Sequence, residues 1–209
     1  MMNNGVPYYR KPVLDHIARN VLNSFDPRIL MSAPRAVPIE EIIEAQGLII
    51  EYQHLRRDMR VLGETVFENA EIPVYDMQER SYTTILVEAG TILIDARLLM
   101  PGQEGRMRYT LAHELSHWLL HKKLFLGSDC LAAKVDSPDH ALSSEAEQDV
   151  ERQADLLATT LLMPIVKVKQ AFYSLQGQLN SDGIVSRLAA LFGVSKQAMR
   201  IRLTRHNLI

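Results

Sequence analysis

The motif H-E-x-x-H at residues 113–117 constrains this chain more than any other short segment of it. Two histidines four positions apart lie one above the other on an α-helix, so both imidazoles can reach one zinc ion (Zn²⁺). Glu114 lies beside that face, where a carboxylate can accept a proton from a metal-held water. The motif therefore predicts a helix whose His113 and His117 side chains border a cleft. The alternative is a chance match on an ordinary buried helix.

A third metal ligand is required, because catalytic zinc takes three protein ligands and one open position. His121 lies on the same predicted face, but eight helical residues separate it from His113 by about 12 Å. Nitrogens that bind one zinc ion at about 2.0 Å can be only roughly 4 Å apart. We therefore expect His121 beside the site, in a supporting or structural role. The longer form H-E-x-x-H-x-x-G-x-x-H is absent, because Lys123 occupies the position of its third histidine.

Glu151 and Asp155 supply carboxylates on one face of a second predicted helix, next to an apolar stripe. A carboxylate held near a core is unfavourable unless it is paired or bound to metal, which favours Glu151 as the third ligand. Asp155 would then accept the spare N–H of a ligand histidine and fix its tautomer. The alternative is a surface pair involving Arg152. Other possible ligands nearby are Glu145, Glu147, Asp149 and His140.

Composition limits the remaining possibilities. The 209 residues are 47% hydrophobic and 23% charged, which is typical of a folded globular protein and excludes a disordered chain. The single cysteine, Cys130, excludes a disulfide framework and a cysteine-based zinc site, and it fits a reducing compartment. The sequence has no apolar run of 18 residues and no signal peptide. We expect a cytoplasmic protein with no membrane partner.

Apolar spacing predicts helices and a small sheet. An amphipathic helix runs from Pro12 to Phe25, a proline-rich connector follows, and Gly47 ends a second, short helix. Residues 48–50 read as a strand, and the apolar stretches 83–87 and 91–94 read as the two arms of a hairpin. From Gly105 onward the patterns are helical, apart from a looser segment at 127–144.

These elements predict an α+β fold, in which a small antiparallel sheet packs with the zinc-site helices and a helical subdomain follows. We divide the chain into an N-terminal helix and linker (1–36), a core that carries the predicted zinc site (37–164) and a basic C-terminal subdomain (165–209).

The C-terminal subdomain contains seven lysines and arginines and one acid, Asp182. Residues 188–195 resemble the first helix and turn of a helix-turn-helix, with Ser195 as the N-cap of the next helix. That next helix carries three arginines, so nucleic-acid binding is possible through this subdomain. We favour a helical subdomain packed on the core. The three arginines are Arg200, Arg202 and Arg205.

Three separated blocks, in this order, resemble the ImmA/IrrE family of zinc metallopeptidases. They are RYTLAHELSHWLLH at 108–121, VERQADLLATTLLMP at 150–164 and VSRLAALFGVSKQAMRIRL at 185–203. The resemblance extends from about Val13 to the C-terminus. The departures are Ser116 where the family often has glycine, Leu157 where it often has phenylalanine, and a longer insert at 127–144.

The resemblance implies zinc bound by His113, His117 and Glu151, with Glu114 as the catalytic base. It also implies a protein substrate, namely a helix-turn-helix repressor whose cleavage derepresses stress, phage or mobile-element genes. Two alternatives remain open, a DNA-binding regulator and a zinc-dependent sensor that keeps the site without turnover.

Overall fold

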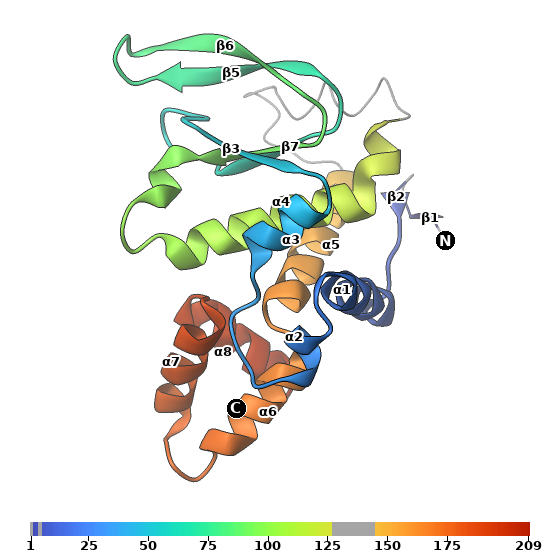
Figure 1. Cartoon of the computed structure of the whole chain (residues 1–209), viewed down its shortest axis with the longest axis vertical. Coiled ribbons are helices and arrows are strands. Elements are labelled where there is room, and N and C mark those ends of the chain that lie inside the picture. Colours follow the sequence, from blue (N-terminus) through green and yellow to red (C-terminus); the bar gives the residue numbers. More distant parts are fainter. Residues whose placement is uncertain (1, 4–5, 127–144) are drawn as a thin grey trace.

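The computed structural model describes residues 2–3, 6–126 and 145–209. The predicted insert at 127–144, and with it Cys130 and His140, lies outside the described residues. Figure 1 shows small sheets on one side of a long helix, α4 (Glu104–Phe125), and a group of helices on the other. Among the helices of the described ranges, none has the length and apolar character needed to cross a membrane.

The N-terminal region is helical after a short pair of strands, β1 (Met2–Asn3) and β2 (Val6–Pro7). Helix α1 (Lys11–Phe25) has a proline in its first turn and buries one apolar face, as the sequence predicts. Helix α2 (Arg28–Met31) and helix α3 (Ile39–Ala45) follow. The chain leaves α3 through Gly47, whose φ of 75° is readily adopted only by glycine.

A three-stranded sheet lies next to α4. Its order is β3 (Ile49–Gln53), β7 (Thr91–Asp95) and β4 (Gly63–Val66). Strand β7 is parallel to β3 and antiparallel to β4, and every residue of β7 is buried. A strand that is apolar on both faces is most stable in the middle of a sheet, between two partners.

The predicted hairpin between 83–87 and 91–94 is wrong. Strand β6 (Ser81–Val87) instead pairs with β5 (Ala70–Asp76) in a separate antiparallel hairpin, and β7 inserts between β3 and β4. The sheet next to α4 is therefore mixed and not purely antiparallel. The α+β class is confirmed, with the sheets in the first part of the chain and helices α5–α8 in the last.

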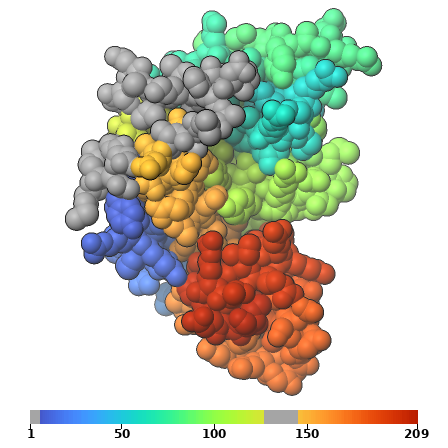
Figure 2. All heavy atoms as spheres, turned by 180° about the vertical axis from the view of Figure 1, so that it is seen from behind, coloured from blue at the N-terminus to red at the C-terminus, as the bar shows by residue number. Residues whose placement is uncertain are grey.

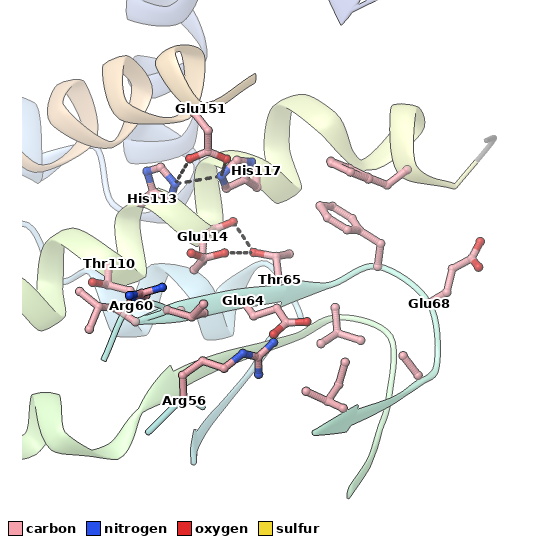
Figure 3. Close-up of a pocket in the computed structure, with 18 of the residues that line it drawn as sticks. Arg56, Arg60, Glu64, Thr65, Glu68, Thr110, His113, Glu114, His117 and Glu151 are labelled. Atoms are coloured by element: carbon pink, nitrogen blue, oxygen red, sulfur yellow. Dashed lines mark hydrogen bonds and ion pairs between the residues drawn. The ribbon is translucent and has the colours of Figure 1, made fainter. Parts of the chain in front are cut away.

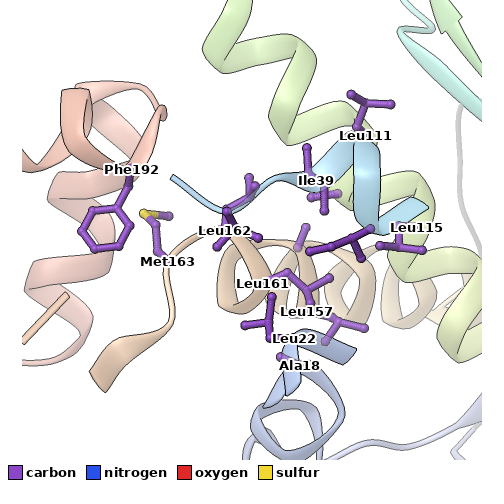
Figure 4. Packing of buried hydrophobic residues seen from close by; sticks show 14 of the residues in the cluster. Ala18, Leu22, Ile39, Leu111, Leu115, Leu157, Leu161, Leu162, Met163 and Phe192 are labelled. Carbon is purple, nitrogen blue, oxygen red and sulfur yellow. The ribbon is translucent and has the colours of Figure 1, made fainter. Parts of the chain in front are cut away.

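Helix α5 (Glu145–Leu162) packs against α4 and α1 around the main hydrophobic core. Leu111 and Leu115 of α4 and Leu157 and Leu161 of α5 are fully buried members of this core, and Figure 4 shows Ile39 between Leu111 and the α5 residues. Because α4 packs on α5 in this way, the histidines on a neighbouring face of α4 lie next to the first half of α5. The apolar residues that the sequence places on the two zinc-site helices, Leu111 and Leu115 on one and Leu157 and Leu161 on the other, are buried as expected.

The C-terminal helices are α6 (Ile165–Leu175), α7 (Ser181–Phe192) and α8 (Lys196–Arg205), and they form a lobe beside α4 and α5 (Figure 2). Gly193, with φ of 63°, ends α7, and the Ser195 hydroxyl caps α8 by accepting the N–H of Ala198, as predicted.

The lobe is joined to α4 through polar and apolar contacts. Arg108 of α4 donates from Nε to the Gly193 carbonyl at 3.2 Å and from Nη2 to the Val37 carbonyl at 2.6 Å. Phe192 belongs to the same hydrophobic cluster as Leu22 and Leu111. Buried residues from all three expected parts of the chain thus belong to one hydrophobic cluster, and the C-terminal lobe contacts α4 near its start.

Candidate metal centre

Three potential metal ligands meet where α4 faces α5. His113 and His117 project from α4, and Glu151 reaches toward them from α5 (Figure 3). The two Nε2 atoms are 2.9 Å apart, and the Glu151 carboxylate oxygens lie 3.2 Å from His113 Nε2 and 3.4 Å from His117 Nε2. Two imidazoles and a carboxylate at such mutual distances suit a tetrahedral ion bound at about 2.0–2.2 Å. The three residues selected from the sequence thus come together.

Asp155 lies directly behind His113. Its Oδ1 is 3.0 Å from His113 Nδ1, and it also accepts a hydrogen bond from the Tyr109 hydroxyl at 2.7 Å. A carboxylate at Nδ1 places the proton on that nitrogen and leaves Nε2 as the free electron-pair donor. This is the position that the sequence argument requires of Asp155.

His121 lies behind His117 and has no exposed surface. Its Nδ1 is 3.3 Å from His117 Nδ1, so His121 can accept the proton that leaves His117 Nε2 free for a metal. Burial lowers the pKa of His121 to about 4, and the amide of Gln153 partly offsets this. At physiological pH the hydrogen-bond acceptor behind His117 is therefore the neutral side chain of His121. The acceptor behind His113 is the charged carboxylate of Asp155.

Charge at the two histidines is set by opposite influences. Burial lowers the pKa of His113, but hydrogen bonds to Asp155 and Glu151 outweigh burial and raise that pKa to about 10. Burial outweighs the carboxylate of Glu151 and, with a smaller contribution from neighbouring His113, lowers the pKa of His117 to about 3. Two carboxylates next to one buried histidine favour a positive charge at this point, which a metal cation supplies.

Glu151 differs from the sequence argument in one respect. Its side chain is 60% exposed, so it lies at the open side of the cluster and is not held against the core. Desolvation raises its pKa, but the hydrogen bond to His113 and the electrostatic influence of the two histidines lower it by more, so Glu151 is ionised. Its suitability as a ligand therefore comes from its position opposite the histidines and not from the cost of burial.

Glu114 is buried on the other side of the cluster, against strand β4 (Figure 3). The Thr65 hydroxyl of β4 lies 2.7 Å from Glu114 Oε2 and 2.9 Å from the Glu114 carbonyl. Burial raises the pKa of Glu114 to about 7, although His113 and Thr65 lower it in part. A carboxyl with a pKa near neutrality can both take up and release a proton under physiological conditions.

These residues line a pocket of about 570 Å³ that extends along β4. The chain from residue 61 to residue 70 forms one wall, and α4 and α5 contribute the metal-ligand cluster. At one end, Phe67 stacks on Phe125 with ring centroids 4.6 Å apart. Its volume lies within the range that is typical of ligand-binding pockets, about 300–1,000 Å³.

Comparison with known families decides the class of the protein. Residues 59–204, well over half of the chain, match the model of the peptidase M78 family, described as the IrrE N-terminal-like domain. The chain belongs to this family. The M78 match confirms the resemblance found in the sequence and makes the protein a metallopeptidase, a hydrolase of peptide bonds. No match was found among curated proteins.

Two parts of this M78 site were not predicted from the sequence, namely Thr65 and Gly63. Both lie on β4, about fifty residues before Glu114 in the sequence, and neither belongs to a motif. Gly63 has no side chain where β4 passes closest to Glu114. A methyl group there would lie 2.6 Å from Thr110 Cγ2 and 2.8 Å from Glu114 Cγ. The strand can thus approach α4 this closely only because residue 63 is glycine.

We expect Gly63→Ala to displace Glu114 and to lower both stability and activity. Overpacking of this kind lowers the free energy of unfolding by about 1–3 kcal/mol. A shift of about 1 Å in a catalytic group can lower the rate by about 100-fold. Urea unfolding and peptide cleavage would measure the two effects. Gly105→Ala is the matched control, because its added methyl would lie no closer than 3.4 Å to any neighbour. Equal behaviour of the two variants would contradict the steric role of Gly63.

Proposed function

We propose that this protein is a zinc-dependent endopeptidase that cleaves a helix-turn-helix repressor. The observation that carries the enzymatic part is the convergence of His113, His117 and Glu151 beside the buried carboxyl of Glu114. Zinc bound by these three side chains supplies Lewis acidity, which makes water more acidic and polarises a peptide carbonyl. Two imidazoles and one carboxylate also suit iron, but a glutamate base next to the first histidine favours zinc.

Glu114 is placed to move the proton in this reaction. Its carboxylate accepts a proton from the attacking water and later gives it to the departing amine, so the carboxyl returns to its starting state. Thr65 keeps Glu114 Oε2 in one orientation. Asp155 and His121 hold the two imidazoles with Nε2 directed at the third ligand.

Strand β4 offers a binding edge for an extended peptide. It is an outer strand of its sheet and pairs only with β7 among the described strands, while its residues line the pocket. A substrate segment that hydrogen-bonds to this edge would pass between β4 and the metal-ligand cluster. This arrangement requires an extended substrate segment, so the cleaved bond would lie in a loop, a linker or a locally unfolded part of the repressor.

A DNA-binding role is less well supported by the C-terminal helices. Arg202 is 4% exposed and donates from Nε to the Met163 carbonyl, and Arg200 pairs with Asp182. Two of the three arginines that would contact DNA are therefore engaged within the protein. Arg205 is exposed.

The experiment that tests the proposal incubates the zinc-loaded protein with candidate helix-turn-helix repressors. We expect one repressor to be cut at a single bond, which intact-mass measurement would identify from two new fragments. Chelation should stop the reaction, and added zinc should restore it. Intact repressors together with cleavage of an unrelated unfolded protein would overturn the repressor proposal and leave the peptidase assignment in place.

A further inference from the structure

A second cavity, of about 590 Å³, lies between the start of α4, the end of α5 and the start of α8. It shares Tyr109 and Asp155 with the peptidase pocket, so these two residues stand between the two spaces. The C-terminal lobe forms its far wall. The mechanism proposed above uses no group of this cavity beyond the shared pair.

The charges around this cavity are unbalanced. Arg106, Arg202 and Arg205 line it, and Asp155 is the one acid that lines it within the described ranges. That carboxylate already interacts with His113 and Tyr109. The peptidase pocket, in contrast, is lined by four glutamates and Asp155 against two arginines, Arg56 and Arg60. The second cavity is therefore a positively charged space next to an acidic one.

Arg202 is the most informative of these residues, because it is buried and incompletely hydrogen-bonded. It is 4% exposed, its Nε donates to the Met163 carbonyl at 3.1 Å, and its Nη2 has no partner within the described structure. Burial lowers the pKa of Arg202 to about 10, against a smaller opposite influence of Asp15. A buried guanidinium with a free donor is unfavourable unless an anion or an acceptor completes its environment.

The backbone adds to the positive character of this space. Gly105 in the first turn of α4 and Ser195 at the N-cap of α8 both line the cavity. The two segments touch, because a methyl group on Gly105 would lie 3.4 Å from the Ser195 nitrogen. The first turns of two helices thus present their positive dipole ends near the three arginines.

We propose that this cavity binds an anionic oxygen group, a carboxylate or a phosphate, in addition to the peptide bound in the metal pocket. The free Nη2 of buried Arg202 donates to the anion, and exposed Arg106 and Arg205 contact the anion as well. The group can come from an acidic side chain of the bound protein or from a free small anion. Because Tyr109 and Asp155 line the cavity, an occupant would lie next to Asp155, the residue that orients His113.

The test adds inorganic phosphate to the zinc-loaded full chain that carries Glu114→Gln. The readout is the set of arginine Nε–H signals in NMR spectra. Chloride keeps the ionic strength constant, and Arg202→Lys identifies the Arg202 signal. We expect a saturable shift of that signal. Removal of charged hydrogen-bond donors in Arg106→Gln/Arg205→Gln should weaken phosphate binding by about 10-fold.

The matched control is Arg187→Gln/Lys196→Gln, which removes the same charge from α7 and α8 at exposed positions that do not line the cavity. We expect its phosphate affinity to equal that of the parent protein. An Arg202 signal that neither phosphate nor the glutamate peptide described below moves would overturn the proposal. So would equal weakening in both double variants, because the effect would then be one of net charge. Phosphate bound at the metal would not depend on Arg106 or Arg205.

A second arm distinguishes the two sources of the anion. The probes are the blocked peptides acetyl-Gly-Gly-Glu-Gly-Gly-amide and its glutamine counterpart. A shift of the Arg202 signal by the glutamate peptide alone supports recognition of an acidic side chain, and a shift by phosphate alone supports a free anion. Failure of both probes rejects the anion site. None of these readouts requires cleavage, so they are independent of the proposed peptidase substrate.

Discussion

Glu114→Gln is expected to lower the rate of peptide cleavage by about 10²–10⁴-fold, the usual contribution of a general acid–base group. Glutamine keeps the size of the side chain and can still accept the hydrogen bond from Thr65 through its amide oxygen. It cannot take up a proton from water. Metal content should remain that of the wild type, because Glu114 is not one of the three converging ligands. Cleavage of the identified repressor or of an unfolded protein, stopped at fixed times, would measure the rate.

The control for this prediction is Glu68→Gln. Glu68 lines the same pocket and is exposed, but it lies away from the metal-ligand cluster (Figure 3). The change therefore removes an equal charge from the pocket without touching the proposed base, and activity should stay within a few-fold of wild type. Full activity of Glu114→Gln would show that another group moves the proton. A loss of activity that follows a loss of metal would assign Glu114 to metal binding.

The helices of this protein could be predicted because their signals are local. The apolar spacing of α1, the glycine that follows α3 and the Ser195 cap of α8 each depend on residues within a few turns of one another. The histidine pair belongs to the same class, because its spacing has a meaning only on a helix. Glu151 required a further step, the need for a third ligand, and the structure places it opposite the histidines.

The sheet and part of the site could not be predicted, because they depend on contacts between distant segments. Strands β6 and β7 are neighbours in sequence, yet β7 pairs with β3 and β4. Its side chains are buried on both faces, which requires a central position in the sheet, but the sequence pattern alone is equally compatible with a hairpin. Thr65 and Gly63 acquire their roles only once β4 lies against α4.

Glu151→Ala is expected to remove most of the metal from the protein. The wild type should carry about one zinc per chain, as three protein ligands and one open position imply. Without Glu151, the two histidines retain only two of the three ligand atoms, and the positive charge favoured at His113 loses one of its two carboxylate partners. Elemental analysis of protein purified without chelator would measure the zinc content, and circular dichroism would show that the fold is kept.

Three further variants make the expected loss specific. Glu147→Ala removes a carboxylate from the same helix, one turn before Glu151, and should keep the metal. Asp155→Asn and His121→Ala should weaken zinc binding by about 10–100-fold without abolishing it, because each removes a group that orients a ligand. The affinities would come from competition with a chromogenic chelator. Zinc bound equally well by Glu151→Ala and wild type would reject Glu151 as the third ligand, and equal loss in Glu147→Ala would point to Glu147 instead.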